Sequence, residues 1–373
     1  MTPSHPTPGP GAVSARPPAP SGPSASPTAP APTAPARPGG RAAALRVLGL
    51  VVLAGVLLLA VWASVMVGSG RVAASDVLPA LLDPDHADKA HLILREVRFP
   101  RTAAGVLAGV ALGLAGTVMQ GIARNPLADP GILGVNAGAS AAVVFAIAVL
   151  GMTNPSHYIW FGFLGALAAS LLVFCVGSLG RGGATPVKLA LTGAATSAAL
   201  LSLTTAMLLT DAASFDQYRF WQVGSLTGRE PDVLWQALPF VVVGSVLALA
   251  LGSRLNALAL GDDLARALGQ HVGRTRALCA AVVVLLCGAA TVVAGPIAFL
   301  GLVVPHAARL CVGPDHRWVL PYSALMSPVL LLVADLVGRT VARPGEVQAG
   351  VVTAVIGAVP FVLLVRRRKA AGL

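Results

Sequence analysis

The sequence predicts an all-α protein that crosses a membrane about ten times. Of its 373 residues, 55% are hydrophobic and only 11% are charged, and its mean hydropathy is +0.78. Soluble domains carry roughly 25% charged residues, so this chain has too few charges to cover its surface in water. Apolar runs of about 20 residues, the length that a helix needs to cross a bilayer, recur along the chain. Together these observations exclude a large soluble protein.

Ten apolar runs define the expected spans. They are residues 45–67, 102–122, 135–151, 158–179, 189–210, 233–252, 277–294, 296–312, 318–337 and 347–365. Several are rich in Gly, Ala and Ser, which allow helices to approach closely, so we expect a compact helical bundle.

Residues 1–40 differ from the rest of the chain. They hold nearly half of its prolines, mixed with Ala, Ser, Thr and Gly, and almost no large apolar residue. A segment of this composition cannot bury a core, so we expect a disordered Pro/Ala-rich tail on the cytoplasmic side. Residues 41–373 are then the transmembrane domain.

The charges between spans predict the orientation. If the tail is cytoplasmic, most loops on its side carry an excess of Arg and Lys, as does the sequence RRRK at 366–369. An even number of spans also returns the C-terminus to that side. We therefore expect a multi-pass protein of the cytoplasmic membrane with both termini cytoplasmic. This pattern explains most of the formal charge of +11 without a nucleic-acid partner.

The sequence offers no group that would carry covalent chemistry. Its four cysteines lie in or beside apolar runs without CxxC spacing, which favours small buried side chains over a disulfide or metal site. His306 and Arg309 share one helical face, but no further ligands are evident nearby, so we interpret them as packing and hydrogen-bonding residues. None of the three lysines follows a glycine, so the chain has no phosphate loop. We expect no catalytic residue, metal or cofactor, and any ATP hydrolysis must come from a partner.

Two strings of residues identify the chain more closely. The first is RFPR at 98–101, continued by MQ at 119–120 and RNPLADPGILG at 124–134; the second is GPIAFLGLVVPH at 295–306, followed by Arg309. Polar and helix-breaking residues within apolar segments need a functional or packing reason. Over residues 45–369 the chain resembles the FecCD-type permease subunits of bacterial ABC importers for iron–siderophore complexes and cobalamin. The resemblance implies the type II ABC importer permease fold.

The loop at about 255–275 contains a short amphipathic pattern. Leucines recur every four residues and glycines flank the pattern, which alone fits either a helix lying on lipid or a helix that contacts a partner. The resemblance implies the second, a coupling helix that docks in a groove of the ATPase subunit. The residues predicted for this contact are Leu260, Gly261, Leu264, Ala265, Leu268 and Gly269.

Three arginines lie at the ends of spans on the expected outer side. Arg98 and Arg101 precede the second span, and Arg339 ends the ninth. Such residues either extend to lipid headgroups or bind a partner. The resemblance implies that they pair with glutamates on a substrate-binding protein, since arginine and carboxylate form planar bidentate pairs.

The resemblance also implies an inner gate. Pro126 restricts Asn125 to an extended conformation, so the second span must end there, and Asn125 and Leu127 match gate positions. A second gate element, usually Ser or Thr before the fifth span, is displaced here to Thr185. In the fifth span, Thr196, Ser197 and Thr205 either line an aqueous path or bond neighbouring helices.

These expectations combine into one function. We expect half of a transport path at a permease dimer interface, with an identical or a non-identical second permease, two ATPase subunits and an extracytoplasmic binding protein. The expected cargo is an iron(III)–siderophore complex, with cobalamin second and haem third. A membrane-embedded enzyme would need acids or histidines clustered at one depth, whereas Asp335 is the only acid inside a predicted span. A passive channel would not need the coupling loop.

Overall fold

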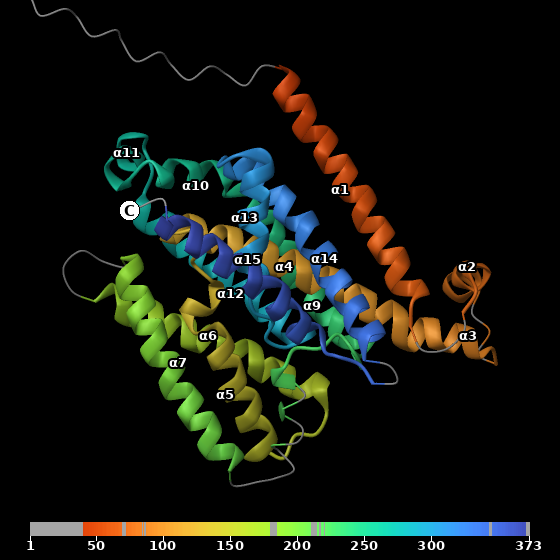
Figure 1. The fold of residues 1–373 in the computed structure, drawn as a ribbon. Helices are drawn as coiled ribbons and strands as arrows, with labels where there is room; N and C mark the ends of the chain where they lie inside the picture. Colours follow the sequence, from red (N-terminus) through yellow and green to blue (C-terminus); the bar gives the residue numbers. More distant parts are fainter. Residues whose placement is uncertain are drawn as a thin grey trace, which may run out of the picture. The chain divides into compact units, whose positions relative to one another are not determined.

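The described part of the chain is built almost entirely of helices, and it contains no β-strand (Figure 1). The computed structural model describes residues 40–68, 72–83, 85, 87–179, 185–209, 215, 218–219, 221–342 and 345–370. Nearly all of the predicted tail, at 1–39, lies outside these residues. Residues 44–373 form one packed unit, and the arrangement described below is that of this unit.

All ten predicted spans correspond to apolar helices. Seven helices are long and apolar enough to cross a membrane, and three shorter apolar helices accompany them within the described residues. The ten are α1 (Gly40–Met66), α4 (Phe99–Ala123), α5 (Val135–Ala148), α6 (Pro155–Ser178), α7 (Pro186–Leu208), α9 (Pro231–Ala250), α12 (Val272–Ala294), α13 (Leu300–Val312), α14 (His316–Val341) and α15 (Ala349–Ala370).

The eighth predicted span is shorter than expected. The apolar run predicts a span at 296–312, but α13 begins only at Leu300. Gly295 and Phe299 both adopt positive φ angles, of 75° and 66°, and Pro296 lacks a backbone N–H, so this stretch cannot be helical. The 13 residues of α13 extend about 20 Å, less than the hydrocarbon thickness of a bilayer.

Short elements join the long helices. They are α2 (Ala74–Leu82), α3 (Lys89–Leu92), the π-helix η1 (Ile93–Arg98), the 3-10 helix η2 (Pro130–Leu133), α10 (Gly252–Ala259) and α11 (Asp262–Ala267). The leucine pattern predicts α11, whereas no sequence pattern predicts α2 or α3. Residues 89–123, from α3 through η1 to the end of α4, are continuously helical.

α4 is the central helix of the bundle and packs against α9, α12, α13 and α14. A series of glycines explains how close these contacts are. A Cβ at Gly109 would lie 2.4 Å from the backbone of Pro328 in α14, and one at Gly116 would lie 2.0 Å from the carbonyl oxygen of Gly301 in α13. Only glycine fits at such distances, so these glycines of α4 determine how closely α13 and α14 pack against it.

α5, α6 and α7 form a second group, in which α5 contacts both of the other two helices (Figure 1). Two of these helices begin with a proline after a side-chain cap: Asn154 accepts a hydrogen bond from Ser156 N before α6, and Thr185 accepts one from Lys188 N before α7. α7 is mostly exposed within this single chain: only 11% of its most apolar 18-residue stretch is buried.

Candidate functional site

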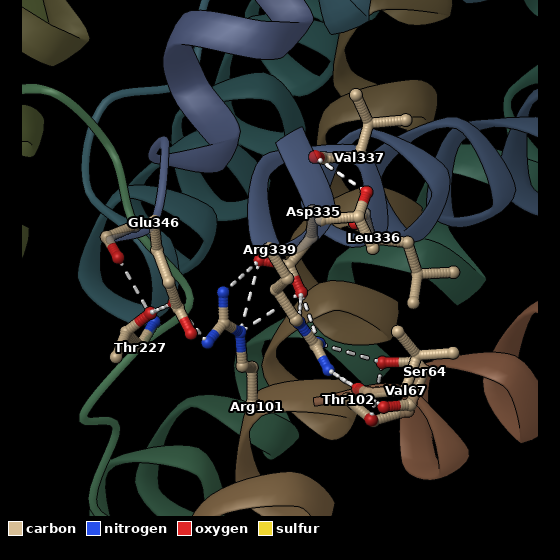
Figure 2. A network of polar contacts seen from close by, with 12 residues as sticks. Ser64, Val67, Arg101, Thr102, Thr227, Asp335, Leu336, Val337, Arg339 and Glu346 are labelled. Carbon is tan, nitrogen blue, oxygen red and sulfur yellow. Dashed lines mark hydrogen bonds and ion pairs between the residues drawn. The ribbon is translucent and has the colours of Figure 1, made fainter. Parts of the chain in front are cut away.

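Two of the three arginines predicted to bind a partner, Arg101 and Arg339, form one network with Asp335 and Glu346 (Figure 2). The third, Arg98, is also buried and bonds the end of α1 beside Arg339. We call these five residues the arginine cluster. Asp335 of α14 lies between two of the guanidinium groups. Arg101 Nε lies 3.1 Å from each carboxylate oxygen of Asp335, and Arg101 Nη2 donates to Oδ1 at 2.8 Å. Arg339 Nε donates to Asp335 Oδ2 at 2.8 Å. α4 and α14 are thereby joined by charge-assisted hydrogen bonds as well as by glycine packing.

The same arginines satisfy the C-terminal carbonyl groups of α1. The last carbonyls of a helix lack intrahelical partners, and basic side chains are favoured beside them. Arg339 Nη1 donates to the carbonyl oxygens of Ser64 and Val67, both at 2.8 Å. Arg98 Nη1 donates to those of Val65 and Met66, at 2.7 and 2.9 Å. One end of α1 is therefore attached to the bundle through these two guanidinium groups.

The three arginines predicted to contact a binding protein are buried. Arg98, Arg101 and Arg339 are only 2%, 6% and 5% exposed, and all three are bonded within the chain. Contact with a binding protein stays a prediction, and a partner would have to reach guanidinium groups that already have internal acceptors. Glu346, which is 36% exposed, bonds Arg101 Nη1 at 2.7 Å and is the accessible acid of the cluster.

At the opposite end of α4, the predicted gate residues form a tight turn. Arg124 ends the helix in the left-handed conformation, with φ 47°. Asn125 Oδ1 then accepts a hydrogen bond from Leu127 N at 2.9 Å, and Asn125 O accepts one from Ala128 N at 3.1 Å. We call residues 125–128 the gate turn. The prediction that α4 ends before the proline is confirmed, and Thr185, near the second gate position, is the N-cap of α7.

The predicted coupling loop contains two short helices, α10 and α11, separated by Leu260 and Gly261. Gly261 and Gly269 adopt φ angles of 110° and 80°, which L side chains rarely adopt, so both chain reversals require glycine. Leu260, Leu264 and Leu268 are 59%, 57% and 63% exposed, so the predicted leucine stripe is open. Ala265, from the same predicted set, is fully buried and packs into the main core.

Asp262, the first residue of α11, joins this loop to the helical bundle. Its Oδ1 accepts a hydrogen bond from Arg124 Nη2 and another from Arg276 Nη2 of α12, the latter at 3.0 Å. Burial acts to raise the pKa of Asp262, but the hydrogen bond from Arg124 and the positive charges of Arg276, Arg124 and Arg266 lower that pKa below its usual value. The carboxylate is therefore charged at neutral pH.

Gln120 and Arg309 connect the two strings that identified the chain. Gln120 Nε2 donates to the carbonyl oxygens of Gly301 and Leu302 at 3.2 and 3.1 Å, and Gln120 Oε1 accepts from Arg309 Nη2. The hydrogen-bonding role predicted for Arg309 is thus confirmed. Gln120 and Arg309 also line a cavity of about 440 Å³ beside the gate turn.

The polar residues of α7 do not share one environment. Thr196 is buried, Ser197 is half-buried, and Thr205 is exposed with its hydroxyl bonded to the carbonyl oxygen of Leu201 at 2.9 Å. Only the exposed face of α7 is open to a path or to another subunit.

The described residues contain no group of three or more His, Cys, Asp or Glu side chains that could hold a metal ion. Cys279 and Cys287 are buried, Cys175 and Cys311 are exposed, and all four thiols are free.

Asp129 stabilises the turn that follows the gate turn. Its Oδ1 accepts a hydrogen bond from Gly131 N at 2.7 Å, and burial raises the pKa of this carboxyl group.

Comparison with known proteins places the chain in a family. The FecCD transport family matches residues 56–367. The ferric enterobactin transport system permease protein FepD of Escherichia coli (strain K12) is 46% identical over 329 residues, which cover 88% of this chain and 97% of the relative. The cobalamin import system permease protein BtuC of Halobacterium salinarum is 38% identical over 292 residues, which cover 77% of this chain and 76% of the relative.

A solved structure has the same fold. A metal-chelate type ABC transporter in an inward-facing conformation matches with a TM-score of 0.73 and 27% identity, covering 85% of this chain and 98% of the solved chain. The predicted type II importer permease fold is therefore confirmed. With a family match that spans most of its length and its series of apolar helices, this chain is a multi-pass membrane protein of the FecCD transport family.

Proposed function

We propose that this chain is the permease subunit of an ABC importer that moves an iron(III)–siderophore complex into the cytoplasm. The observation that carries the proposal is the 46% identity, along nearly the whole of both chains, to a permease named for ferric enterobactin. The more distant cobalamin permease supports cobalamin as the alternative cargo. Haem ranks third.

A strain that lacks this chain tests the choice of cargo. We expect it to lose growth on one or more ferric siderophores under iron limitation, and we expect free ferrous iron to restore growth. Uptake of radiolabelled siderophore and of cobalamin should be measured in the same strain. Normal siderophore uptake with abolished cobalamin uptake would reverse the ranking.

The proposed assembly contains a second permease, two ATPase subunits and an extracytoplasmic substrate-binding protein. The exposed face of α7 supports a subunit interface, because Leu191, Leu201 and Leu203 are 68%, 54% and 54% exposed there. In this arrangement Thr205 faces the interface with the second permease and lines the path, and Thr196 and Ser197 lie farther from the path. The path is neutral, so selectivity resides in the binding protein.

The coupling loop receives the ATPase. The exposed Leu260, Leu264 and Leu268 form an apolar surface that fits a groove on a protein partner. The α11 end of the bundle is then cytoplasmic, as are both termini, and the arginine cluster is on the outer side. Leu264→Asp and Gly261→Pro should leave the permease inserted but separate ATP hydrolysis from transport. Survival of both ATPase co-purification and transport in these variants would refute the docking assignment.

The arginine cluster recruits the binding protein. Two of its arginines, Arg101 and Arg339, share the buried Asp335, and the more exposed Glu346 bonds Arg101. A partner carboxylate that takes the place of Glu346 can therefore reach the Arg101 guanidinium group. Arg98→Glu, Arg101→Glu and Arg339→Glu should each weaken docking, and salt should weaken the unaltered complex. Unchanged affinity in all three variants would refute the assignment; circular dichroism must first show that each variant is folded.

The gate turn closes the inner end of the path through Asn125 and Leu127. The hydrogen bond from Leu127 N to Asn125 Oδ1 supports this role, because it makes the turn a small rigid unit directly after the central helix. Asn125→Ala removes that acceptor. We expect it to raise leakage of chelate through the assembled importer in the absence of ATP, which efflux from loaded proteoliposomes measures.

A further inference from the structure

One carboxylate lies between the proposed coupling loop and the proposed gate. Asp262 begins α11, and it bonds Arg124, which immediately precedes the gate turn. The two residues are 138 positions apart in the sequence, and their sites were predicted separately. Their side chains provide a direct contact between the loop and the end of α4.

The backbone at Arg124 leads directly into the gate turn. Its φ of 47° is one of two positive values among the described residues other than glycine. The next residue, Asn125, donates its N–H to Gln120 O at 3.3 Å and so closes the end of α4. A force on the Arg124 side chain therefore acts on the residue that joins the helix to the gate turn.

A neighbouring ion pair on α11 shows what is particular about Asp262. Asp263 bonds Arg266 within the same helix, and these side chains are 100% and 60% exposed. In the Arg124–Asp262 pair the side chains are 32% and 28% exposed, and Arg276 of α12 donates to the same carboxylate. The first pair stays within α11, whereas the second connects α11 to two long helices.

We propose that the Arg124–Asp262 ion pair transmits movement of α11 to the gate turn, with Arg276 holding the carboxylate in position. This inference rests on the proposed function. Arg124 and Asp262 are positioning residues here: neither needs to contact cargo or ATP. When α11 moves with the ATPase, the charge-assisted bond makes Arg124 and the following turn move with it.

The experiment measures chelate transported per ATP hydrolysed in proteoliposomes that contain the whole importer. Arg124→Gln and Asp262→Asn should each lower this ratio about tenfold or more, because each removes a hydrogen bond between charged groups. Asp263→Asn is the matched control: it removes the same charge from the same turn and should change the ratio less than about twofold. The conservative variant Asp262→Glu should retain most of the ratio.

The double variant tests whether the two residues act as one unit. Arg124→Gln with Asp262→Asn should be no worse than the more affected single variant, since the pair is already broken in each. Arg124→Gln leaves α11 unaltered, so it should still co-purify with the ATPase. Independent effects that multiply in the double variant would overturn the inference, and so would loss of ATPase binding in Arg124→Gln.

Two outcomes separate this inference from the function beneath it. If the unaltered importer transports no chelate with ATP, the proposed function fails. If the unaltered importer couples hydrolysis to transport and Asp262→Asn couples as well as Asp263→Asn, only the transmission role of the pair fails.

Discussion

Replacing Asp335 with asparagine should strongly destabilise the protein. Asp335 is 1% exposed and accepts hydrogen bonds from both Arg101 and Arg339. Asparagine has nearly the same shape but no charge, so two buried guanidinium groups would lose their shared counter-ion. Removing one partner of a buried ion pair typically costs about 3–5 kcal/mol, because the remaining charge is left uncompensated.

Glu346→Gln provides the comparison. It removes a carboxylate that bonds the same Arg101, but this carboxylate is 36% exposed and its interaction is screened by solvent. An ion pair of this kind contributes about 0–1 kcal/mol. The two variants therefore remove the same charge from the same network, at sites that differ in burial and in the number of arginines bonded.

Equilibrium unfolding in detergent micelles or lipid nanodiscs measures both changes. We expect Asp335→Asn to lower the free energy of unfolding by about 3–5 kcal/mol, and Glu346→Gln to lower it by at most about 1 kcal/mol. Limited proteolysis should also show earlier cleavage of α1 in Asp335→Asn, because Arg339 would be less firmly held against the α1 carbonyls. Equal free energies of unfolding for the two variants would refute the reasoning that burial and two arginine partners make Asp335 the central member of the cluster.

Three further predictions concern other parts of the chain. Gly116→Leu should disrupt the contact between α4 and α13 and reduce the yield of monodisperse protein in size-exclusion chromatography, whereas Gly55→Leu should not, because no atom lies within 4 Å of a Cβ at Gly55. Deletion of residues 2–38 should leave membrane insertion and transport nearly unchanged, since it removes no apolar face; loss of either would contradict the interpretation of this segment as a tail. The pKa of Asp262 is lowered, so its charge is lost only as pH falls through that low pKa; the ratio of transport to hydrolysis should not fall through titration of Asp262 between about pH 5 and about pH 8.

Apolar runs were sufficient to locate the helices, because helices that cross a membrane have their backbone hydrogen bonds within the segment and need no partner to define them. The eighth predicted span includes four residues before α13 that are not helical, because the chain around Phe299 is apolar but has a positive φ angle. The helices α1 and α12 begin five residues earlier than the predicted spans. α2 and α3 were missed, since neither has the length or uniform hydrophobicity of a span. Their stability depends on contacts with η1, which local sequence does not reveal.

The contacts of the site were less predictable than its residues. Asp335 was noticed as the only acid inside a span, yet its pairing with Arg101 joins residues 234 positions apart. Nothing in the local pattern indicated that Arg98 and Arg339 would contact the carbonyls of α1. The sequence indicates the string that begins with Arg124 and the leucine stripe as separate features, and only the packing of α4, α11 and α12 brings Arg124, Asp262 and Arg276 together.

ATP-dependent uptake of a radiolabelled ferric siderophore into proteoliposomes tests the central claim most directly. The vesicles should contain this chain, its partner permease and the ATPase subunits, with the binding protein added outside. We expect uptake when hydrolysable ATP is supplied on the side of the membrane that carries the ATPase subunits. We expect no uptake with a non-hydrolysable analogue or with the Leu264→Asp variant. Equal uptake with and without ATP hydrolysis would indicate a passive channel and contradict the account.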